Sequence, residues 1–210
     1  MPRRVIKRYL KILLATLALL AVAALSIKVE PLSERTPKKF DPTEHVARFW
    51  AEELPTLLAS DRVVDADLFC EELKHNRRFL IERYGLTLGI GAPYSLLLGG
   101  EFEVVEVDEE VTTLRTAAQT ELAMRTAYIF GNTVREASGA FSIDDYENTM
   151  DFNHISAALN RCVIEQVVTP ILPTLGMGTR LRVVGAVDLP AEGMPNGLFE
   201  LIPLQIIPLE

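Results

Sequence analysis

One long helical segment within a strand-rich region constrains the fold of this chain most strongly. Apolar side chains recur at helical spacing in residues 141–168 and form a single stripe, which consists of Ile155, Leu159, Cys162, Val163 and Val167. Ser142, three residues before Asp145, predicts a capped start, and Thr169-Pro170 predicts the end of the helix. Three strand-like segments precede this helix and two follow it, so we expect it to plug or bridge a small sheet.

Alternation with a period of two identifies the strands, which we place at residues 101–108, 111–117, 121–130, 180–189 and 199–209. The alternation slips between Val104 and Val105, which predicts a β-bulge. In the third strand, four side chains are expected to share one face: Leu122, Met124, Tyr128 and Phe130. Two amphipathic helices are expected earlier, at residues 43–58 and 65–84, and Pro55 should end or kink the first of them.

This order of elements, with three strands, one helix and two strands, is typical of an OB-type barrel. The sequence therefore predicts an α+β fold: a small antiparallel, OB-like, partly open β-barrel with an inserted helix, preceded by two helices and an N-terminal membrane segment. Other small antiparallel α+β arrangements share the same order. We divide the chain into a signal or anchor segment (1–27), a charged, proline-containing linker (28–42) and one domain (43–210), helical at 43–84 and barrel-like at 86–210.

The N-terminal segment indicates export across a membrane. Five basic residues in the first eleven positions precede an uncharged run at residues 12–27, which places the N-terminus in the cytoplasm and the body across the membrane. Sites of the small-x-small type near Ala23 and Ser26 favour cleavage and a soluble periplasmic product. A helix of 16 residues spans roughly 24 Å of a ~30 Å hydrocarbon core, and flanking lysines can extend it. We favour an uncleaved anchor in the cytoplasmic membrane.

The charge of the body excludes one class of partner. The whole chain carries a net charge of −8, and without the leader 16 basic residues face 29 acidic ones, a net charge of −13. Such a body repels phosphate backbones, so we expect no binding of nucleic acid.

Motifs for catalysis are missing from the sequence, which lacks a nucleophile elbow, an H-E-x-x-H motif, a P-loop and a C-x-x-C pair. We therefore expect no enzymatic activity, no cofactor and no metal. Asp151 and His154 have a spacing compatible with two metal ligands, but a solvated or helix-capping pair is the simpler interpretation. Cys70 and Cys162 lie on or beside apolar stripes, which favours two buried thiols over a disulfide.

Polar residues at the junction between the third strand and the long helix are the candidate ligand- or partner-binding residues: Arg135, Asp145, Asn148 and Asn160. On such a barrel they could line a binding groove. Structural hydrogen bonds that order the loop and cap the helix are the alternative, and the one we favour.

The same junction resembles a bacterial family of predicted periplasmic lipoproteins, domain of unknown function 2291. The resemblance is carried by residues 131–137 (GNTVREA), 141–148 (FSIDDYEN) and 157–160 (AALN), and it extends over the body from Phe40-Asp41 to Pro208-Leu209-Glu210. It implies an exported, membrane-tethered protein, often encoded beside ribose-type sugar ABC transporters, with no established activity. The leader of the family ordinarily ends in a lipidated cysteine, which is lacking here around Leu25-Ser26-Ile27. This departure strengthens the case for a retained transmembrane helix.

Two functions follow as expectations. The first is a non-enzymatic accessory protein on the periplasmic side of the membrane, with components of a sugar ABC transporter as its partners. The alternative is a periplasmic module that binds a small molecule or a glycan.

Overall fold

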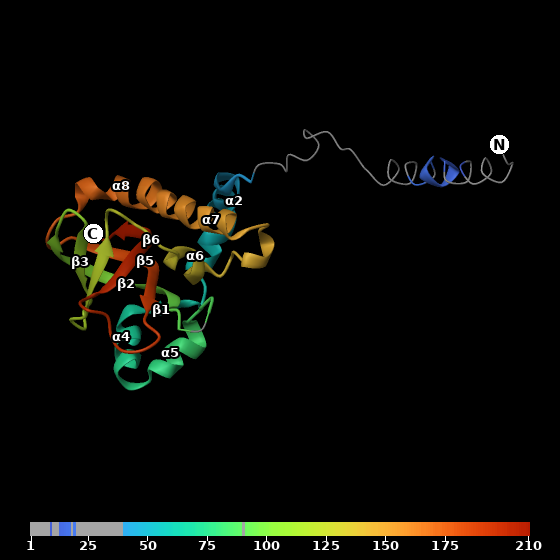
Figure 1. Ribbon diagram of the computed structural model, residues 1–210. Coiled ribbons are helices and arrows are strands. Elements are labelled where there is room, and N and C mark those ends of the chain that lie inside the picture. The colour runs from blue at the N-terminus through green and yellow to red at the C-terminus, as the bar shows by residue number, and fades with distance from the viewer. Residues whose placement is uncertain (1–8, 10–12, 18, 20–39, 90) are drawn as a thin grey trace. The chain divides into compact units, whose positions relative to one another are not determined.

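The computed structural model describes Tyr9, residues 13–17, Leu19 and residues 40–89 and 91–210 (Figure 1). The chain divides into two compact units, Met1–Phe40 and Asp41–Glu210. In the first unit, Tyr9, residues 13–17 and Leu19 are helical. Most of the expected leader and linker, including the cleavage sites, therefore lies outside the described residues.

The second unit is built around a closed barrel of five strands. These strands are β2 (Tyr94–Val107), β3 (Val111–Arg115), β4 (Glu121–Arg125), β5 (Arg180–Leu189) and β6 (Phe199–Pro208). They are hydrogen-bonded in the order β2-β3-β4-β6-β5, and β5 pairs again with β2, which closes the ring. The OB-like barrel is thus confirmed, and its ring of strands is closed. Only the β4–β6 pair within the ring is parallel.

Strand β2 is long enough to pair with two neighbouring strands along different parts of its length. It pairs with β5 from Tyr94 to Glu103 and with β3 from Glu103 onward. Its register with β3 shifts between Val104 and Glu106, which confirms the expected bulge. The expected start of this strand at residue 101 was wrong, because Gly99 and Gly100 lie inside it. A Cβ atom at Gly99 would meet the side chain of Val63 at 2.9 Å, so glycine there lets the short parallel strand β1 (Val63–Asp65) pack close.

Two helices, α4 (Ala66–His75) and α5 (Arg77–Tyr84), cover the end of the barrel opposite the long helix (Figure 1). The Asp65 side chain caps α4 by accepting hydrogen bonds from two backbone N–H groups. Phe69 of α4 is fully buried and meets the ring of Phe199 edge-on, with 5.3 Å between the ring centroids. The single helix expected at 65–84 is therefore two helices, which break at Asn76, where the backbone leaves the helical conformation (φ −151°, ψ 54°).

The long helix follows the short helix α6 (Thr133–Ser138) and the 3-10 turn η3 (Ile143–Asp145). It consists of α7 (Thr149–Cys162), the π-helical segment η4 (Val163–Val168), α8 (Thr169–Ile171) and the 3-10 turn η5 (Leu172–Thr174). Ile155, Leu159 and Val163 are fully buried, as the apolar stripe predicts. The expected start was wrong: Ser142 caps only the 3-10 turn, whereas the Asn148 side chain caps the helix itself.

The expectation that Thr169-Pro170 ends the helix was also wrong, because a wide π-helical segment precedes the proline. The same arrangement occurs at Pro55, where α2 (Pro42–Arg48) runs through the π-helical segment η2 (Phe49–Glu53) into α3 (Leu54–Leu58). Proline lacks an N–H group and its ring crowds the carbonyl one turn earlier. A wider turn leaves that carbonyl room, so both helices continue past their prolines.

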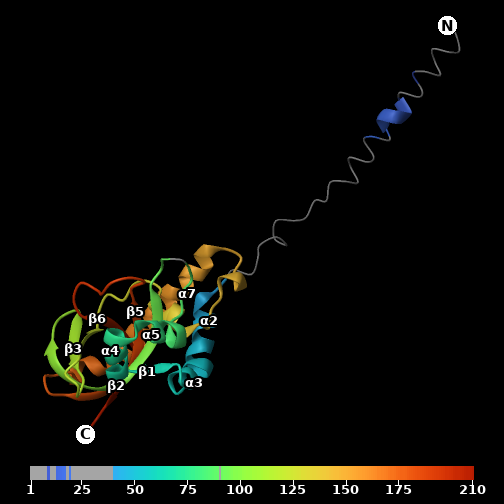
Figure 2. The same ribbon diagram turned by 90° about the horizontal axis from the view of Figure 1, so that it is seen from below.

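Within the described part of the chain, one helix, Thr149–Thr174, is long and apolar enough to cross a membrane by length and composition alone. Its apolar stripe, however, is buried against protein. The segment η4 lies on β6, and α7 packs against α2, as Figure 2 also shows. It is therefore an amphipathic helix that packs on the domain with one face.

Candidate functional site

Beyond β4, the chain leaves the barrel and faces the long helix. The third expected strand, 121–130, was wrong from residue 126 onward. The backbone N–H groups of Thr126 and Ala127 both donate to the carbonyl oxygen of Glu110, and Tyr128 has a positive φ of 52°. These two features turn the chain out of the sheet, so Tyr128 and Phe130 do not share the buried face of Leu122 and Met124.

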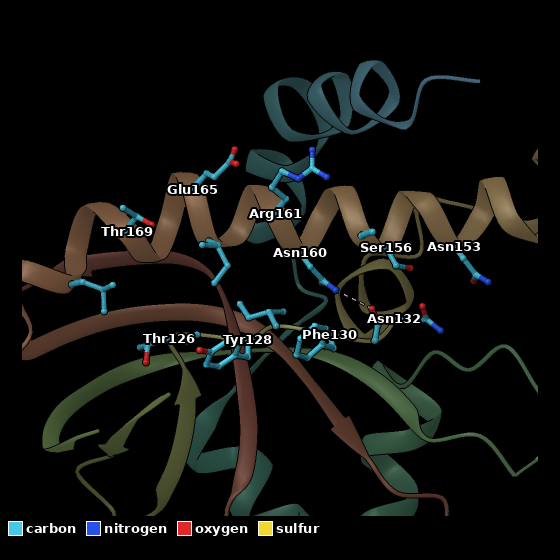
Figure 3. A pocket seen from close by; sticks show the side chains of 16 residues that line it. Thr126, Tyr128, Phe130, Asn132, Asn153, Ser156, Asn160, Arg161, Glu165 and Thr169 are labelled. Carbon is cyan, nitrogen blue, oxygen red and sulfur yellow. Dashed lines mark hydrogen bonds between the residues drawn. The ribbon is translucent and has the colours of Figure 1, made fainter. Parts of the chain in front are cut away.

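The space between this connecting segment, residues 126–132, and the long helix is a cavity of about 670 Å³, which we call the helix groove. Its lining comes from segment 126–132 on one side and from α7, η4, α8 and the first residue of η5 on the other (Figure 3). The residues that matter for its chemistry are Thr126, Tyr128, Phe130, Asn153, Ser156 and Asn160.

Two aromatic side chains dominate the open side of the groove. Tyr128 is 67% exposed and Phe130 is 77% exposed. Single exposed apolar side chains are common in soluble proteins, but here two aromatic rings lie two residues apart beside a cavity. The positive φ of Tyr128 is unusual for a bulky residue and is the kind of backbone strain that occurs at functional sites.

The inner wall of the groove carries uncharged polar groups. The hydroxyl oxygens of Ser156 and Thr126 are buried and have no hydrogen-bond partner among the described residues. Asn153, Asn160 and Asn132 add side-chain amides to the lining. The charged ends of Arg161 and Glu165 point away from segment 126–132 (Figure 3). The groove therefore offers side-chain amides beside apolar and aromatic surface, whereas the two hydroxyl oxygens lie beneath that surface.

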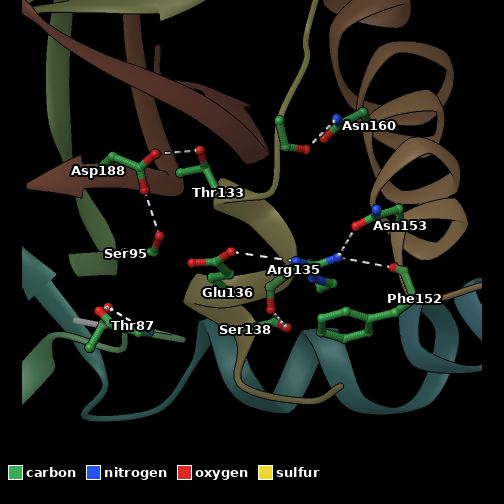
Figure 4. A network of polar contacts seen from close by, with 12 residues as sticks. Thr87, Ser95, Thr133, Arg135, Glu136, Ser138, Phe152, Asn153, Asn160 and Asp188 are labelled. Atoms are coloured by element: carbon green, nitrogen blue, oxygen red, sulfur yellow. Dashed lines mark hydrogen bonds and ion pairs between the residues drawn. The ribbon is translucent and has the colours of Figure 1, made fainter. Parts of the chain in front are cut away.

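A second polar cluster lies nearby, around the buried guanidinium of Arg135, which is 3% exposed. One guanidinium nitrogen donates to the carbonyl oxygen of Phe152 at 3.0 Å, and the guanidinium carbon lies 3.6 Å from the centroid of the Phe152 ring (Figure 4). The other terminal nitrogen lies 3.4 Å from the Glu136 carboxylate. Burial lowers the pKa of Arg135 and raises the pKa of Glu136.

The neighbouring carboxylate of Asp188 ties α6 to the barrel. It accepts hydrogen bonds from the Ser95 hydroxyl at 2.5 Å and from the Thr133 hydroxyl at 2.7 Å (Figure 4). The Asp188 charge also contributes to the raised pKa of Glu136. Because these groups bind one another and hold α6 against α7 and β5, the cluster serves the architecture of the junction.

The four candidate residues are not gathered in one pocket. Asn160 lines the helix groove, whereas Arg135 lines a separate cavity of about 200 Å³ with Glu136, Phe141 and Phe152. Asn148 accepts from the backbone N–H of Asp151 and donates to its carboxylate, so it caps α7, while Asp145 is exposed in η3. A binding role for these residues stays a prediction.

Sequence reasoning missed the residues that form most of the groove: Thr126, Tyr128, Phe130, Asn153 and Ser156. Tyr128 and Phe130 continue the alternation of a buried strand, so the pattern alone assigned them to the core. The one local sign that the chain departs from the sheet is Gly131-Asn132 directly after Phe130.

The other sites considered from the sequence have structural explanations. Asp151 belongs to the cap of α7, and the described residues contain no group of three or more His, Cys, Asp or Glu side chains that could hold a metal ion. Cys70 and Cys162 are both free, the first buried and the second half-buried. Burial raises the pKa of both thiols.

The closed five-stranded barrel, with helices between its third and fourth strands, defines an OB-fold protein. A solved structure of an OB-fold protein from Thermotoga maritima is similar to it, with a TM-score of 0.73 and 22% sequence identity over 82% of this chain and 100% of that chain. The likeness is one of fold. The comparison with curated proteins found no match to the sequence.

The family model of the predicted periplasmic lipoproteins, DUF2291, matches residues 15–207. The chain therefore belongs to this family, whose function is unknown, and the resemblance seen in the sequence is confirmed.

Proposed function

We propose that this chain is a non-enzymatic accessory protein, tethered at the periplasmic face of the cytoplasmic membrane, that acts by binding in the helix groove. The observation that carries the proposal is the groove itself. Two exposed aromatic rings border one cavity beside a strained backbone. Exposed aromatic side chains beside uncharged polar groups are typical of binding surfaces.

The chemistry of the groove favours binding over catalysis. The lining contains no histidine, and its carboxylate, Glu165, points away from segment 126–132, so no pair for general acid–base catalysis is assembled in the groove. The groups whose pKa values are shifted at this junction, Arg135 and Glu136, line the other cavity and are paired with each other. Their pairing supports a structural purpose, because buried charges are usually paired for stability.

The tether is inferred from the leader and the family. The family consists of predicted periplasmic lipoproteins. The two cysteines of this chain, Cys70 and Cys162, both lie in the body, so the leader offers no thiol for lipid attachment. A retained hydrophobic helix at residues 12–27 would hold the body at the membrane instead.

The partners we propose are components of a sugar ABC transporter, on the strength of the gene neighbourhood that the family resemblance implies. A second candidate is a periplasmic module that binds a small molecule or glycan without a transporter. The dimensions of the helix groove favour this second possibility, because about 670 Å³ lies within the usual range for small-molecule sites.

Purification of the full-length chain from gently solubilised native membranes tests the proposal. We expect the intact mass of the unprocessed chain and co-purification of transporter subunits or their sugar-binding protein. The Tyr128→Ala/Phe130→Ala double variant should lose these partners. Phe79→Ala, which removes a partly exposed aromatic side chain on α5, is the matched control and should keep them. Wild-type protein that recovers no transporter component contradicts the accessory function.

A further inference from the structure

The outer face of the long helix carries a regular row of side chains that no other described segment covers. Every fourth residue along this face is exposed and lines the helix groove, and we call this set the outer row: Asn153, Ala157, Arg161, Glu165 and Thr169. Side chains at every fourth position form a ridge, and helices pack on one another by such ridges. The row spans roughly 24 Å at 1.5 Å per residue, which is several turns of helix.

Arg161 and Glu165, at the centre of the outer row, are charged residues whose side chains form no ion pair or hydrogen bond with another described residue. On α5, Arg78 and Glu82 have the same order and spacing, and they are joined by an ion pair of 2.6 Å. The π-helical segment η4 begins between Arg161 and Glu165 and widens the turn. Their charged ends also point away from segment 126–132 (Figure 3). Both charges are therefore free to pair with a second molecule.

The outer row is complementary to itself when a second copy of the chain is turned by 180°. If two long helices run antiparallel, with the two-fold axis midway between Arg161 and Glu165, each Arg161 faces the Glu165 of the other copy. Four residues further out, Ala157 then faces Thr169, and both side chains are small enough for the helices to approach closely. A two-fold interface requires a patch that matches itself, and this chain supplies one.

The charge of the body favours the groove over other surfaces for self-association. Without the leader the net charge is −13, so two copies repel one another at long range. Arg161 and Glu165 are the charged residues of the groove lining, and their charges cancel. Tyr128 and Phe130 border the same groove and are 67% and 77% exposed, so a second helix lying there would also bury apolar surface.

We propose that the outer row and the helix groove form a two-fold interface between two copies of this chain, with their long helices antiparallel. Arg161 of each copy pairs with Glu165 of the other, and the rings of Tyr128 and Phe130 pack against the helix of the other copy. The inference rests on the proposed function in one respect, since it names what covers the groove before a transporter component binds there. Such a component has to displace the second copy, so the two complexes exclude each other.

Cysteine cross-linking in native membranes tests the interface on the full-length chain. One tagged copy carries Ala157→Cys, a differently tagged copy carries Thr169→Cys, and a short bis-maleimide reagent joins neighbouring thiols. Positions 157 and 169 of opposite copies face each other, whereas two positions 157 lie roughly 18 Å apart along the helices. We expect the mixed pair to cross-link and each variant alone to stay at the background. The chain without introduced cysteines measures the background from Cys70 and Cys162.

Charge reversal tests the pairing itself. Arg161→Glu in both copies places carboxylates opposite each other and should lower the cross-linked fraction by roughly tenfold. Arg161→Glu/Glu165→Arg restores opposite charges in the reversed order and should recover the cross-link. Arg78→Glu, which reverses one charge of the exposed pair on α5, is the matched control and should leave the cross-linked fraction unchanged. Circular dichroism of each variant verifies that it is folded.

Three results would overturn the interface: no cross-link between positions 157 and 169, equal cross-linking of each variant alone, or a loss with Arg161→Glu that the double reversal does not recover. The accessory function has its own readout in the recovery of transporter components from membranes. If these are recovered and no cross-link forms, the accessory function stands and the second copy is not the occupant of the groove. If the cross-link forms and none is recovered, the interface stands and the accessory function is contradicted.

Discussion

The side-chain amide of Asn160 on α7 donates a hydrogen bond to the backbone carbonyl oxygen of Gly131, with 3.1 Å between the two atoms. This bond joins the long helix to the segment that carries Tyr128 and Phe130 (Figure 3). Gly131 has a positive φ of 84°, so the chain turns at the point where the bond holds it. The width of the helix groove at this end therefore depends on one amide.

Asn160→Ala should lower the free energy of unfolding by about 0.5–1.5 kcal/mol, because it removes the hydrogen bond to the carbonyl of Gly131, which is exposed and can bind water instead. Hydrogen exchange of the amides at residues 127–132 should accelerate more than exchange in β2. Asn132→Ala is the matched control, since Asn132 is exposed and its side chain does not cap α6. A change within about 0.5 kcal/mol is expected there. Equal losses of stability in the two variants would contradict a stabilising hydrogen bond between α7 and segment 126–132.

Tyr128 offers a direct measure of backbone strain. At φ 52°, glycine is free of the steric clash that both tyrosine and alanine suffer. Tyr128→Gly should therefore be more stable than Tyr128→Ala by about 1 kcal/mol, measured by denaturant unfolding. Both variants remove the ring and should lose ligand binding to the same extent. An alanine variant as stable as the glycine variant would show that the position is unstrained.

Arg135 joins α6 to α7 through its hydrogen bond to the Phe152 carbonyl oxygen, and it pairs with Glu136 on its own helix. Arg135→Met should lower stability by about 1–3 kcal/mol, because the Phe152 carbonyl loses its donor and the half-buried Glu136 carboxylate loses its partner. The double variant Arg135→Met/Glu136→Gln should be less destabilised than the sum of the two single variants, since it also removes the unpaired charge. Stability losses that add exactly in the double-mutant cycle would show that Arg135 and Glu136 do not interact.

Glu136 should make stability depend on pH with a defined sign. Burial raises its pKa in the folded state, the Arg135 charge opposes this, and the Asp188 charge adds to it. An acid with a raised folded pKa contributes stability that is present below its unfolded pKa of about 4.3 and is lost as the pH rises through the folded value. Wild type should therefore lose stability relative to Glu136→Gln as the pH rises from about 4. If the free energies of unfolding of the two proteins changed in parallel with pH, the raised pKa of Glu136 would be contradicted.

Gly185 marks a point where two strands of the barrel approach too closely for a side chain. It lies at the irregularity between β5 and β6, and a Cβ atom there would collide with the carbonyl oxygen of Ile202 and meet Leu201 at 2.9 Å. Gly185→Ala should destabilise the barrel by about 3 kcal/mol. Gly89→Ala, where a Cβ atom meets nothing within 4 Å, should be nearly neutral. The melting temperatures of the two variants provide the comparison.

The barrel could be predicted from sequence because successive side chains along each strand point alternately into the core and away from it, which gives an apolar pattern with a period of two. The strand over residues 180–189 was placed with its observed bounds, and the bulge after Val104 was visible as a slip in the alternation. The buried stripe at Ile155, Leu159 and Val163 identified the long helix. These features depend on local periodicity, which the amino-acid order records directly.

The groove could not be predicted in this way because it depends on backbone geometry and on contacts between distant segments. Tyr128 and Phe130 have the same spacing as Leu122 and Met124. The hydrogen bonds to Glu110 and the positive φ of Tyr128 separate the exposed pair from the buried one. The continuation past Pro170 likewise depends on a π-helical segment that has no marker in the sequence. Asn160 was recognised as a candidate, but its partner Gly131 is 29 positions away.

The proposed accessory function requires the body of the chain to lie outside the cytoplasm, and protease accessibility measures this placement most directly. Protease is added to intact spheroplasts that carry the untagged full-length chain, and residues 41–210 are followed by antibody beside a cytoplasmic marker protein. We predict that the body is digested while the marker survives, and that a short N-terminal fragment stays with the membrane. A body that is protected until the spheroplasts are lysed would contradict the periplasmic placement, and with it the accessory function.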